Sequence, residues 1–190
     1  MIEKLDYVAD NFIPYTYGDS LKILQSISAL ENKEKVLVLV VGANGSGKST
    51  FIANWFTLSN PKMQYVNADL MLVNSGVGNA SYTTMEKTID YVYDLINNNK
   101  SFIYETVFSH LSKLEIANYA KNKGYKIIAV YVKTNDVNIN INRVAKRVSQ
   151  GGHNVPNDKI ISRFNRVIEN VKKLKNISDE FYEFDNSVDI

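Results

Sequence analysis

Apolar residues occur along this chain in two patterns, short unbroken runs and longer segments with a helical period. The clearest run is Val36–Val41, six apolar residues without polar alternation, which is typical of a strand buried on both faces of a parallel sheet. The longer segments repeat apolar residues every three or four positions, as amphipathic helices do. Strands and helices alternate, which predicts the α/β class with helices on both faces of a parallel sheet.

Turn residues and caps place the ends of these elements. Strands are predicted at 36–41, 63–67, 101–104, 126–132 and 181–184. Helices are predicted from Asp19 or Ser20 to about 33, at 48–58, at 83–98, from 112 to Gly124, from Asp136 or Asn138 to Gly151, and after Pro156. Ser112 and Glu115 have the spacing of a capping box at the start of the helix from 112. In the helix at 83–98, Met85 is expected to face inward with Ile89, Val92 and Ile96.

The first strand runs into a glycine-rich segment that fits the pattern G-x-x-x-x-G-K-[ST] at every fixed position. Its glycines let backbone N–H groups point at phosphate oxygens, and the following helix adds its positive end. Lys48 reaches the β- and γ-phosphates, and Ser49 offers a hydroxyl to Mg²⁺. The alternative is a glycine-rich turn that fits by chance. The predicted ATP-binding residues are Gly42, Ala43, Asn44, Gly45, Ser46, Gly47, Lys48, Ser49 and Thr50.

Two acidic residues stand at the ends of the second and third predicted strands, where parallel sheets bind ligands. Asp69 is the candidate general base, which accepts the proton of an attacking hydroxyl; the alternative is a helix cap or a surface turn. Glu105 is expected to serve Mg²⁺, mostly through water, or to bind a substrate hydroxyl, and the alternative is again a cap. Thr106 and His110 follow on the same loop as candidate substrate-binding residues.

Arginines gather after the fourth strand. Arg143 and Arg147 share one helix face, and Arg163 lies on the next helix, beyond Gly151-Gly152. Two arginine-bearing helices joined at glycines predict a small lid over 138–170, whose guanidinium groups stabilise charge on a transferred phosphate. A solvated basic face with no catalytic duty is the alternative.

Composition narrows the class of protein. The 190 residues carry a net charge of +2, no cysteine and two histidines, so disulfides and thiolate metal sites are excluded. No apolar run is long enough to cross a membrane, and the first residues lack the pattern of a signal peptide. We expect one cytoplasmic domain over 1–190, with a helical segment at 1–33 and no affinity for nucleic acid or membrane.

Several segments together resemble one family. The P-loop, Asn67-Ala68-Asp69, Tyr104-Glu105-Thr106, the stretch from Arg143 to Pro156 that includes Gly151-Gly152-His153, and Arg163 look like the zeta-toxin family of P-loop kinases. The similarity covers about residues 36–187. The glycine-glycine-histidine segment with its flanking arginines is much more specific than the P-loop alone.

The resemblance implies a five-stranded parallel sheet of order 2-3-1-4-5, as in the nucleotide-kinase branch of P-loop proteins. It implies ATP- and Mg²⁺-dependent phosphorylation of UDP-N-acetylglucosamine and restraint by a small antitoxin. In this family pattern Lys48 and Ser49 bind phosphate and magnesium, Asp69 is the base and Glu105 contacts substrate. Arg147 and Arg163 hold the γ-phosphate.

The chain departs from that pattern where a threonine and an arginine would grip the sugar nucleotide, since it has Val107 and Ser109 there. Phosphotransfer to another small hydroxyl acceptor, such as a nucleoside or an antibiotic, therefore stays open. A hypothesis of a different class is an ATP-binding regulatory switch that hydrolyses slowly, if at all, and signals by closing its lid.

Overall fold

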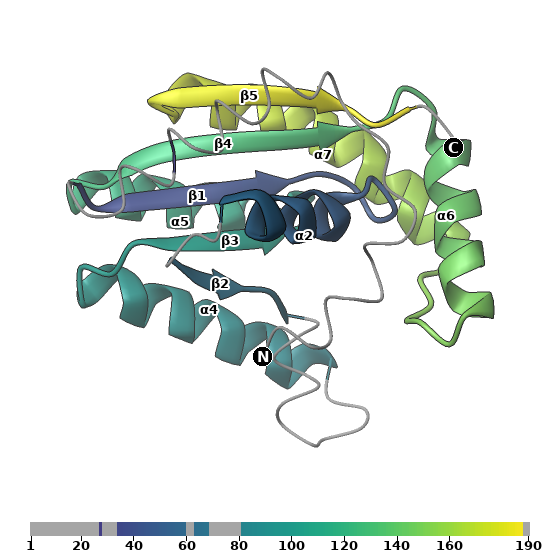
Figure 1. Cartoon of the computed structure of the whole chain (residues 1–190), viewed down its shortest axis with the longest axis horizontal. Helices are drawn as coiled ribbons and strands as arrows, with labels where there is room; N and C mark the ends of the chain where they lie inside the picture. Colours follow the sequence, from purple (N-terminus) through teal and green to yellow (C-terminus); the bar gives the residue numbers. More distant parts are fainter. Residues whose placement is uncertain (1–26, 28–33, 60–62, 69–80, 188–190) are drawn as a thin grey trace.

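Five parallel strands form a single sheet in the order β2-β3-β1-β4-β5 (Figure 1). The computed structural model describes residues 27, 34–59, 63–68 and 81–187. The strands are β1 Val36–Val41, β2 Gln64–Val66, β3 Phe102–Thr106, β4 Lys126–Lys133 and β5 Glu180–Asp185. The helices are α2 Lys48–Ser59, α4 Ser81–Asn97, α5 Ser112–Asn122, α6 Val137–Ser149 and α7 Asn157–Ile177. The predicted class, strand direction and strand order are confirmed.

The central strand β1 is enclosed on all sides. It pairs with β3 on one edge and β4 on the other, and all six of its residues have no solvent exposure. Leu37, Leu39 and Val41 face one hydrophobic cluster, and the alternate residues face another. This is why the run is apolar without alternation: neither face of the strand meets water.

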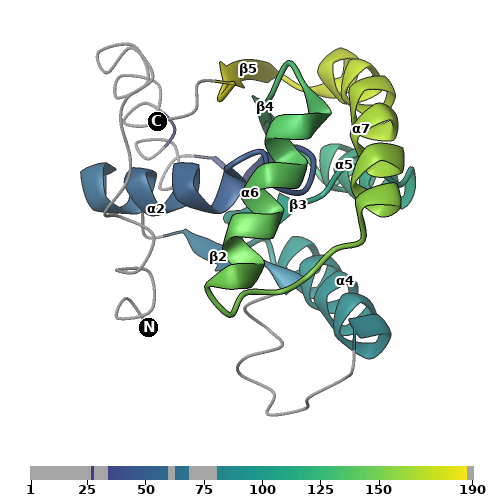
Figure 2. The ribbon, with the colours of Figure 1, turned by 90° about the vertical axis from the view of Figure 1, so that its right-hand side faces the viewer.

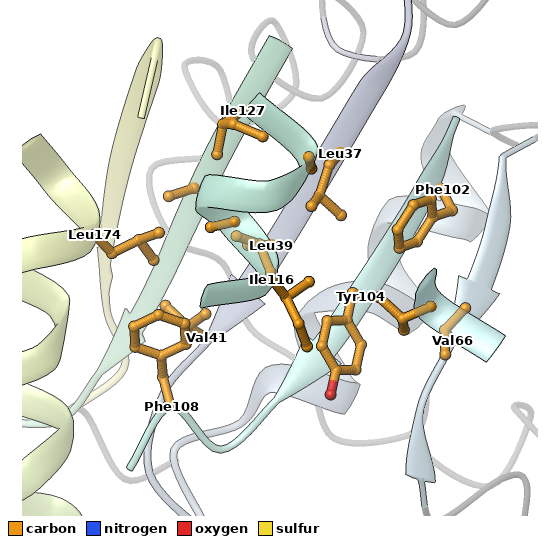
Figure 3. Close-up of a cluster of buried hydrophobic side chains, with 14 of the residues drawn as sticks. Leu37, Leu39, Val41, Val66, Phe102, Tyr104, Phe108, Ile116, Ile127 and Leu174 are labelled. Atoms are coloured by element: carbon orange, nitrogen blue, oxygen red, sulfur yellow. The ribbon is translucent and has the colours of Figure 1, made fainter. Parts of the chain in front are cut away.

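Helices cover both faces of the sheet, as predicted. Helices α4, α5 and α7 lie on one face and contribute Val92, Ile116 and Val167 to the cluster that holds Leu39 (Figures 2 and 3). Helix α2 lies on the other face with Trp55. Ile27, which is helical and buried in that second cluster, belongs to the predicted helix at 20–33, whose other residues lie outside the described part.

The carboxyl edge of the sheet lies under α6. The strands all point toward this edge, and α6 crosses it (Figures 1 and 2). Asp136 caps α6 by accepting a hydrogen bond from the Asn138 N–H at 2.9 Å, one of the two caps expected from the sequence. The loops after β1, β3 and β4 therefore meet beneath one helix.

Two local predictions were wrong. Met85 is 48% exposed, because α4 packs on the core through Val92 and Ile96, two turns further along. Helix α5 starts without a capping box: its N-cap is Leu111, which has no capping side chain. His110 caps this end of the helix instead, because its Nδ1 accepts from the Ser112 backbone N–H at 3.3 Å and lies 3.0 Å from the Ser112 hydroxyl oxygen.

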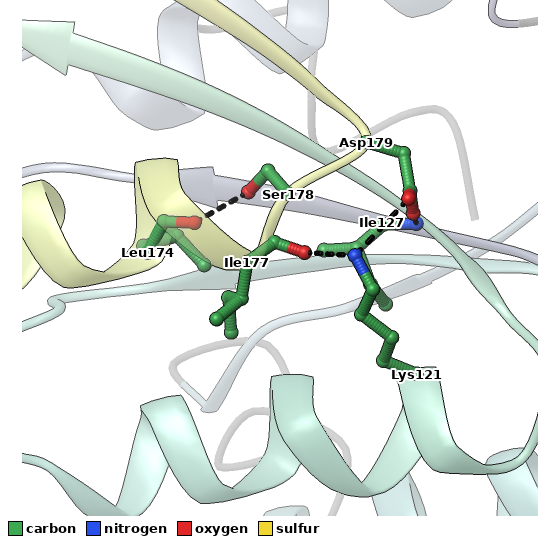
Figure 4. Close-up of polar contacts among 6 residues, drawn as sticks. All are labelled: Lys121, Ile127, Leu174, Ile177, Ser178 and Asp179. Atoms are coloured by element: carbon green, nitrogen blue, oxygen red, sulfur yellow. Dashed lines mark hydrogen bonds and ion pairs between the residues drawn. The ribbon is translucent and has the colours of Figure 1, made fainter.

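At the turn between α7 and β5, Asp179 joins three elements (Figure 4). Its Oδ2 accepts the Ile127 N–H of β4 at 2.8 Å, and its Oδ1 accepts from Lys121 of α5 at 3.1 Å. Lys121 also donates to the Ile177 carbonyl at 2.6 Å. Burial raises the pKa of Asp179, but the hydrogen bonds from Ile127 and Lys121 outweigh it and leave the pKa below its ordinary value of 3.8.

This carboxylate should stabilise the fold at neutral pH. Because its pKa is lowered by folding, its contribution is present above pH 3.8 and is lost as the pH falls through the lowered value. We expect Asp179→Asn to lower the free energy of unfolding by about 1 kcal/mol at pH 7, mostly because a neutral amide oxygen accepts the Ile127 N–H more weakly than a carboxylate does, since an exposed ion pair adds little. Urea denaturation at pH 7, 5 and 3 measures this.

The difference between Asp179→Asn and the wild type should stay constant from pH 7 to pH 5 and shrink at pH 3. Glu183→Gln is the matched control, because Glu183 pairs with Lys133 at 3.3 Å between exposed side chains and should change stability little. A difference that grew on acidification would contradict the assignment.

Candidate active site

The loop between β1 and α2 has the sharp backbone that its glycines predict. Gly45 and Gly47 adopt φ angles of 77° and 95°, a left-handed region that residues with a side chain enter at a cost. The Ser46 N–H donates to the Ala43 carbonyl at 3.3 Å, and α2 begins with the Phe51 N–H on the Gly47 carbonyl at 2.9 Å. The chain thus turns from strand to helix within six residues.

Lys48 is folded back over this loop. The residue is buried, and its Nζ donates to the Ala43 carbonyl at 2.8 Å. A carbonyl is a neutral partner, so the positive charge is not cancelled by this contact. An ammonium held against the loop backbone in this way can exchange the carbonyl for a phosphate oxygen, which forms the stronger, charge-assisted bond.

Ser49 and Glu105 are in direct contact, although 56 residues separate them. The Ser49 hydroxyl donates to Glu105 Oε1 at 2.7 Å. The second oxygen, Oε2, accepts from the Tyr65 hydroxyl and from Asn67 Nδ2, the latter at 2.8 Å. Glu105 is buried, and its three donors come from α2, from β2 and from the residue that follows β2. The structure therefore brings together Ser49 and Glu105, two of the predicted site residues.

Asn44, the third residue of the loop, connects it to α6 and α7. Its carbonyl accepts from Asn140 Nδ2 at 2.7 Å, and its Oδ1 accepts from Arg163 Nη1 at 3.1 Å. Asn140 is fully buried and also accepts the Thr134 hydroxyl. Gly45 lies so close to Asn140 that a Cβ would come within 2.5 Å of its carbonyl oxygen. Helix α6 is thereby seated directly on the loop.

Asn186, just after β5, closes the loop from the other side. Its Nδ2 donates to the Ser46 carbonyl at 2.8 Å and occupies the space that a Cβ on Gly47 would need, at 2.2 Å. The backbone of Asn186 is itself fixed, since its N–H donates to the Lys133 carbonyl and its carbonyl accepts from Arg143 Nη1, each at 2.8 Å.

Arg147 lies apart from these contacts. Its Nη2 donates to the His153 carbonyl at 2.7 Å, and its side chain packs on Gly152, where a Cβ would meet Arg147 Cγ at 2.5 Å. Its Nε is buried and has no hydrogen-bond partner among the described residues. The structure thus brings Arg163 to the P-loop and holds Arg147 on the loop between α6 and α7.

The remaining predicted residues are dispersed. Asp69 lies outside the described residues. Thr106 is paired in register with Val41, directly before the P-loop. His110 is exposed, contacts Ser112, and lines a hollow of about 470 Å³ between the loop after β3 and α7, together with residues that include Arg166 and Asn170.

Sequence reasoning missed four polar residues of the site, namely Tyr65, Asn67 as a partner of Glu105, Asn140 and Asn186. Tyr65 and Asn67 stand at the carboxyl end of β2, beside β3, so the strand order was the signal that could have found them. The described residues hold no cluster of three or more histidine, cysteine, aspartate or glutamate side chains suited to a metal ion. None of the described helices has the length and apolar character needed to span a membrane.

Comparison with known protein families identifies a match over most of the chain. The family model described as zeta toxin matches residues 60–186, two thirds of the chain. An uncharacterized protein from Haemophilus influenzae is 25% identical over 146 residues, which cover 75% of this chain and 99% of that protein.

Solved structures share the fold. The structure of the PezAT chromosomal toxin–antitoxin system of Streptococcus pneumoniae superposes with a TM-score of 0.61 at 17% identity, covering 91% of this chain and 79% of that one. The AvrRxo1-ORF1:AvrRxo1-ORF2 complex with ATP superposes with a TM-score of 0.60 at 16% identity, covering 92% of this chain and 57% of that one. At these identities the likeness establishes the architecture.

The bond from Asn186 to Ser46 should limit opening of the P-loop. We expect Asn186→Ala to leave the fold intact, because the two backbone hydrogen bonds of residue 186 do not need its side chain. Loss of one hydrogen bond, worth about 1 kcal/mol, should speed amide exchange at 44–48 about fivefold. Hydrogen exchange followed by mass spectrometry measures this.

Asn98→Ala is the control for that experiment. Asn98, directly after α4, makes exposed contacts with Asp94 in the last turn of that helix, so its loss should leave exchange in the P-loop unchanged. Equal exchange at 44–48 in the wild type and Asn186→Ala would show that the Asn186 side chain does not hold the loop.

Proposed function

The chain belongs to the zeta toxin family, and from this premise we propose that it is an ATP- and Mg²⁺-dependent phosphotransferase acting on a hydroxyl of a small acceptor. The observation that carries the proposal is the contact between Ser49 of the P-loop and the buried Glu105. It joins the phosphate-binding loop to a carboxylate at the carboxyl edge of the sheet, where α/β proteins bind their ligands.

The nucleotide is proposed to lie along residues 42–50, with Lys48 on the β- and γ-phosphates. The oxygens of Ser49 and Glu105 fit the requirements of Mg²⁺, which is commonly held by one or two protein oxygens together with phosphates and water. Bound there, the ion would neutralise charge on the phosphates. Tyr65 and Asn67 keep Glu105 oriented toward Ser49.

Asp69 is the proposed general base. The role rests on its place in the sequence, two residues after Asn67, whose side chain is bonded to Glu105. A carboxylate that follows the second strand in the sequence is a candidate to take the proton of the acceptor hydroxyl as its oxygen attacks phosphorus. Glu105 and Thr106, at the end of β3, and His110, on the loop that follows, are proposed to contact the acceptor.

Arg147 and Arg163 are proposed to bind the γ-phosphate as charge moves onto it. Within the described residues each guanidinium donates to a neutral oxygen, Arg147 to the His153 carbonyl and Arg163 to the Asn44 side chain. Neither has an acidic partner there. Exchange of a neutral acceptor for a phosphate oxygen is favourable, because the charged bond is about twice as strong. Arg163 is already at the P-loop, and Arg147 would turn from the loop that holds it.

UDP-N-acetylglucosamine is the candidate acceptor that the family suggests, and a small antitoxin is the candidate protein partner. The Streptococcus pneumoniae protein that shares the fold belongs to a toxin–antitoxin system. Since ATP is the phosphate donor, we propose that the protein acts in the cytoplasm.

Replacement of the base should separate binding from transfer. We expect Asp69→Asn to keep the affinity for ATP within a few fold and to slow phosphate transfer by about 10²- to 10⁴-fold, the usual contribution of general base catalysis. Lys48→Ala should abolish ATP turnover. The assay is mass spectrometry of protein, ATP and Mg²⁺ incubated with UDP-N-acetylglucosamine and common nucleosides. Asp158→Asn, on an exposed residue of α7, is the matched control.

A gain of one phosphate on UDP-N-acetylglucosamine, lost in Asp69→Asn, would establish both reaction and acceptor. Loss of ATP without a phosphorylated acceptor would direct the search to other hydroxyl compounds. Full transfer by Asp69→Asn would refute the base assignment. If ATP stays intact while raising the melting temperature, the ATP-dependent switch becomes the better account.

A further inference from the structure

Lys113, in the first turn of α5, is a buried lysine that lacks a counter-charge. The residue is 5% exposed, yet its ammonium makes no hydrogen bond or ion pair with any residue in the described part of the chain. Among the described residues, the ammonium makes a cation–π contact with the ring of Tyr104, with 5.7 Å between Nζ and the ring centroid. Lysines are almost never buried unless they are paired, because the ammonium loses its hydration.

Tyr104 is in a similar position. It lies on β3, is 2% exposed, and its hydroxyl makes no hydrogen bond with the described residues. The ring belongs to the hydrophobic cluster, and its hydroxyl oxygen lies at the margin of that cluster (Figure 3). An ammonium and a hydroxyl, both without polar partners, are therefore neighbours near the carboxyl edge of the sheet.

The alternation of strand residues separates this pair from the P-loop. Tyr104 and Glu105 are consecutive on β3, so their side chains point to opposite faces of the sheet. Glu105 meets Ser49 on the face covered by α2, whereas Tyr104 and Lys113 lie on the face covered by α4 and α5. Lys48 already serves the phosphates of a nucleotide on the P-loop. Lys113 is thus placed for a different anionic group.

We propose that Lys113 and Tyr104 form a binding site for an oxyanion, a phosphate or a carboxylate, carried by the acceptor. The inference rests on the proposed phosphotransferase function only in assigning the anion to the acceptor. The anion supplies the missing counter-charge of Lys113 and accepts a second hydrogen bond from the Tyr104 hydroxyl. Charge-assisted hydrogen bonds of this kind are about twice as strong as neutral ones.

The first experiment needs no acceptor and no turnover. The full chain is saturated with adenylyl imidodiphosphate and Mg²⁺ to fill the P-loop, and its melting temperature is followed against inorganic phosphate or acetate at constant ionic strength. We expect a saturable rise of about 3 to 6 °C at ten times the dissociation constant. A larger response to phosphate or to acetate identifies the oxyanion. Repeating the titration in Lys48→Ala without nucleotide excludes phosphate binding at the P-loop.

Lys113→Met should remove this response and raise the melting temperature in the absence of anion, because it replaces a mostly buried lysine that has no counter-charge among the described residues with an apolar side chain. If Lys113 only stabilised the fold, Lys113→Met would instead lower the melting temperature. Tyr104→Phe keeps the ring under the ammonium and should weaken the response. Lys123→Met is the matched control, since Lys123 also stacks on a tyrosine, at 5.4 Å from Tyr119, but is exposed.

With any acceptor found by the transfer assay, Lys113→Met should raise KM for that acceptor about 10- to 100-fold, with kcat and the KM for ATP nearly unchanged. The absence of a saturable response in the wild type, or an equal response in Lys113→Met, would overturn the site. Failure to find a phosphorylated acceptor would count against the proposed function and leave the titration decisive for the anion site.

Discussion

The burial of β1 on both faces is the constraint on which the rest of the structure depends. Because β3 and β4 flank the strand and helices cover both its faces, its end at Val41 is fixed, and the P-loop begins from a rigid point. Gly42 meets the Val132 carbonyl so closely that a Cβ would lie 2.3 Å from it. The backbone at the start of the P-loop therefore packs so closely on β4 that there is no room for a side chain at residue 42.

Around that loop the protein uses neutral partners. Asn140 and Asn186 donate to loop carbonyls, and Asn44 accepts from Arg163. Amide groups shape the loop backbone without adding negative charge of their own beside it. The buried carboxylate of Glu105 is directed at Ser49. The site thus keeps its negative charge where a cation would be held and its positive charge where phosphates would lie.

Local patterns predicted the elements well, because burial and capping act over short stretches of chain. The run at 36–41 coincides with β1. Ser49 and Glu105 were both predicted as site residues from the sequence, and their contact is seen only in the structure. The strand order came from the family resemblance. Contacts across the fold were harder: the roles of Asn140 and Asn186 depend on which residues the loops bring within hydrogen-bond distance. Neither the His110 cap nor the contact of Arg147 with His153 has a signature in sequence spacing.

The bond between Asn186 and Ser46 spans 140 residues of sequence. The phosphate-binding loop is made early during synthesis, but the side chain that supports it follows the last strand of the sheet. A nascent chain that has folded its first strands still lacks this support, and β5 must dock on β4 before Asn186 can reach the loop. Support of the P-loop by Asn186 is therefore coupled to completion of the sheet.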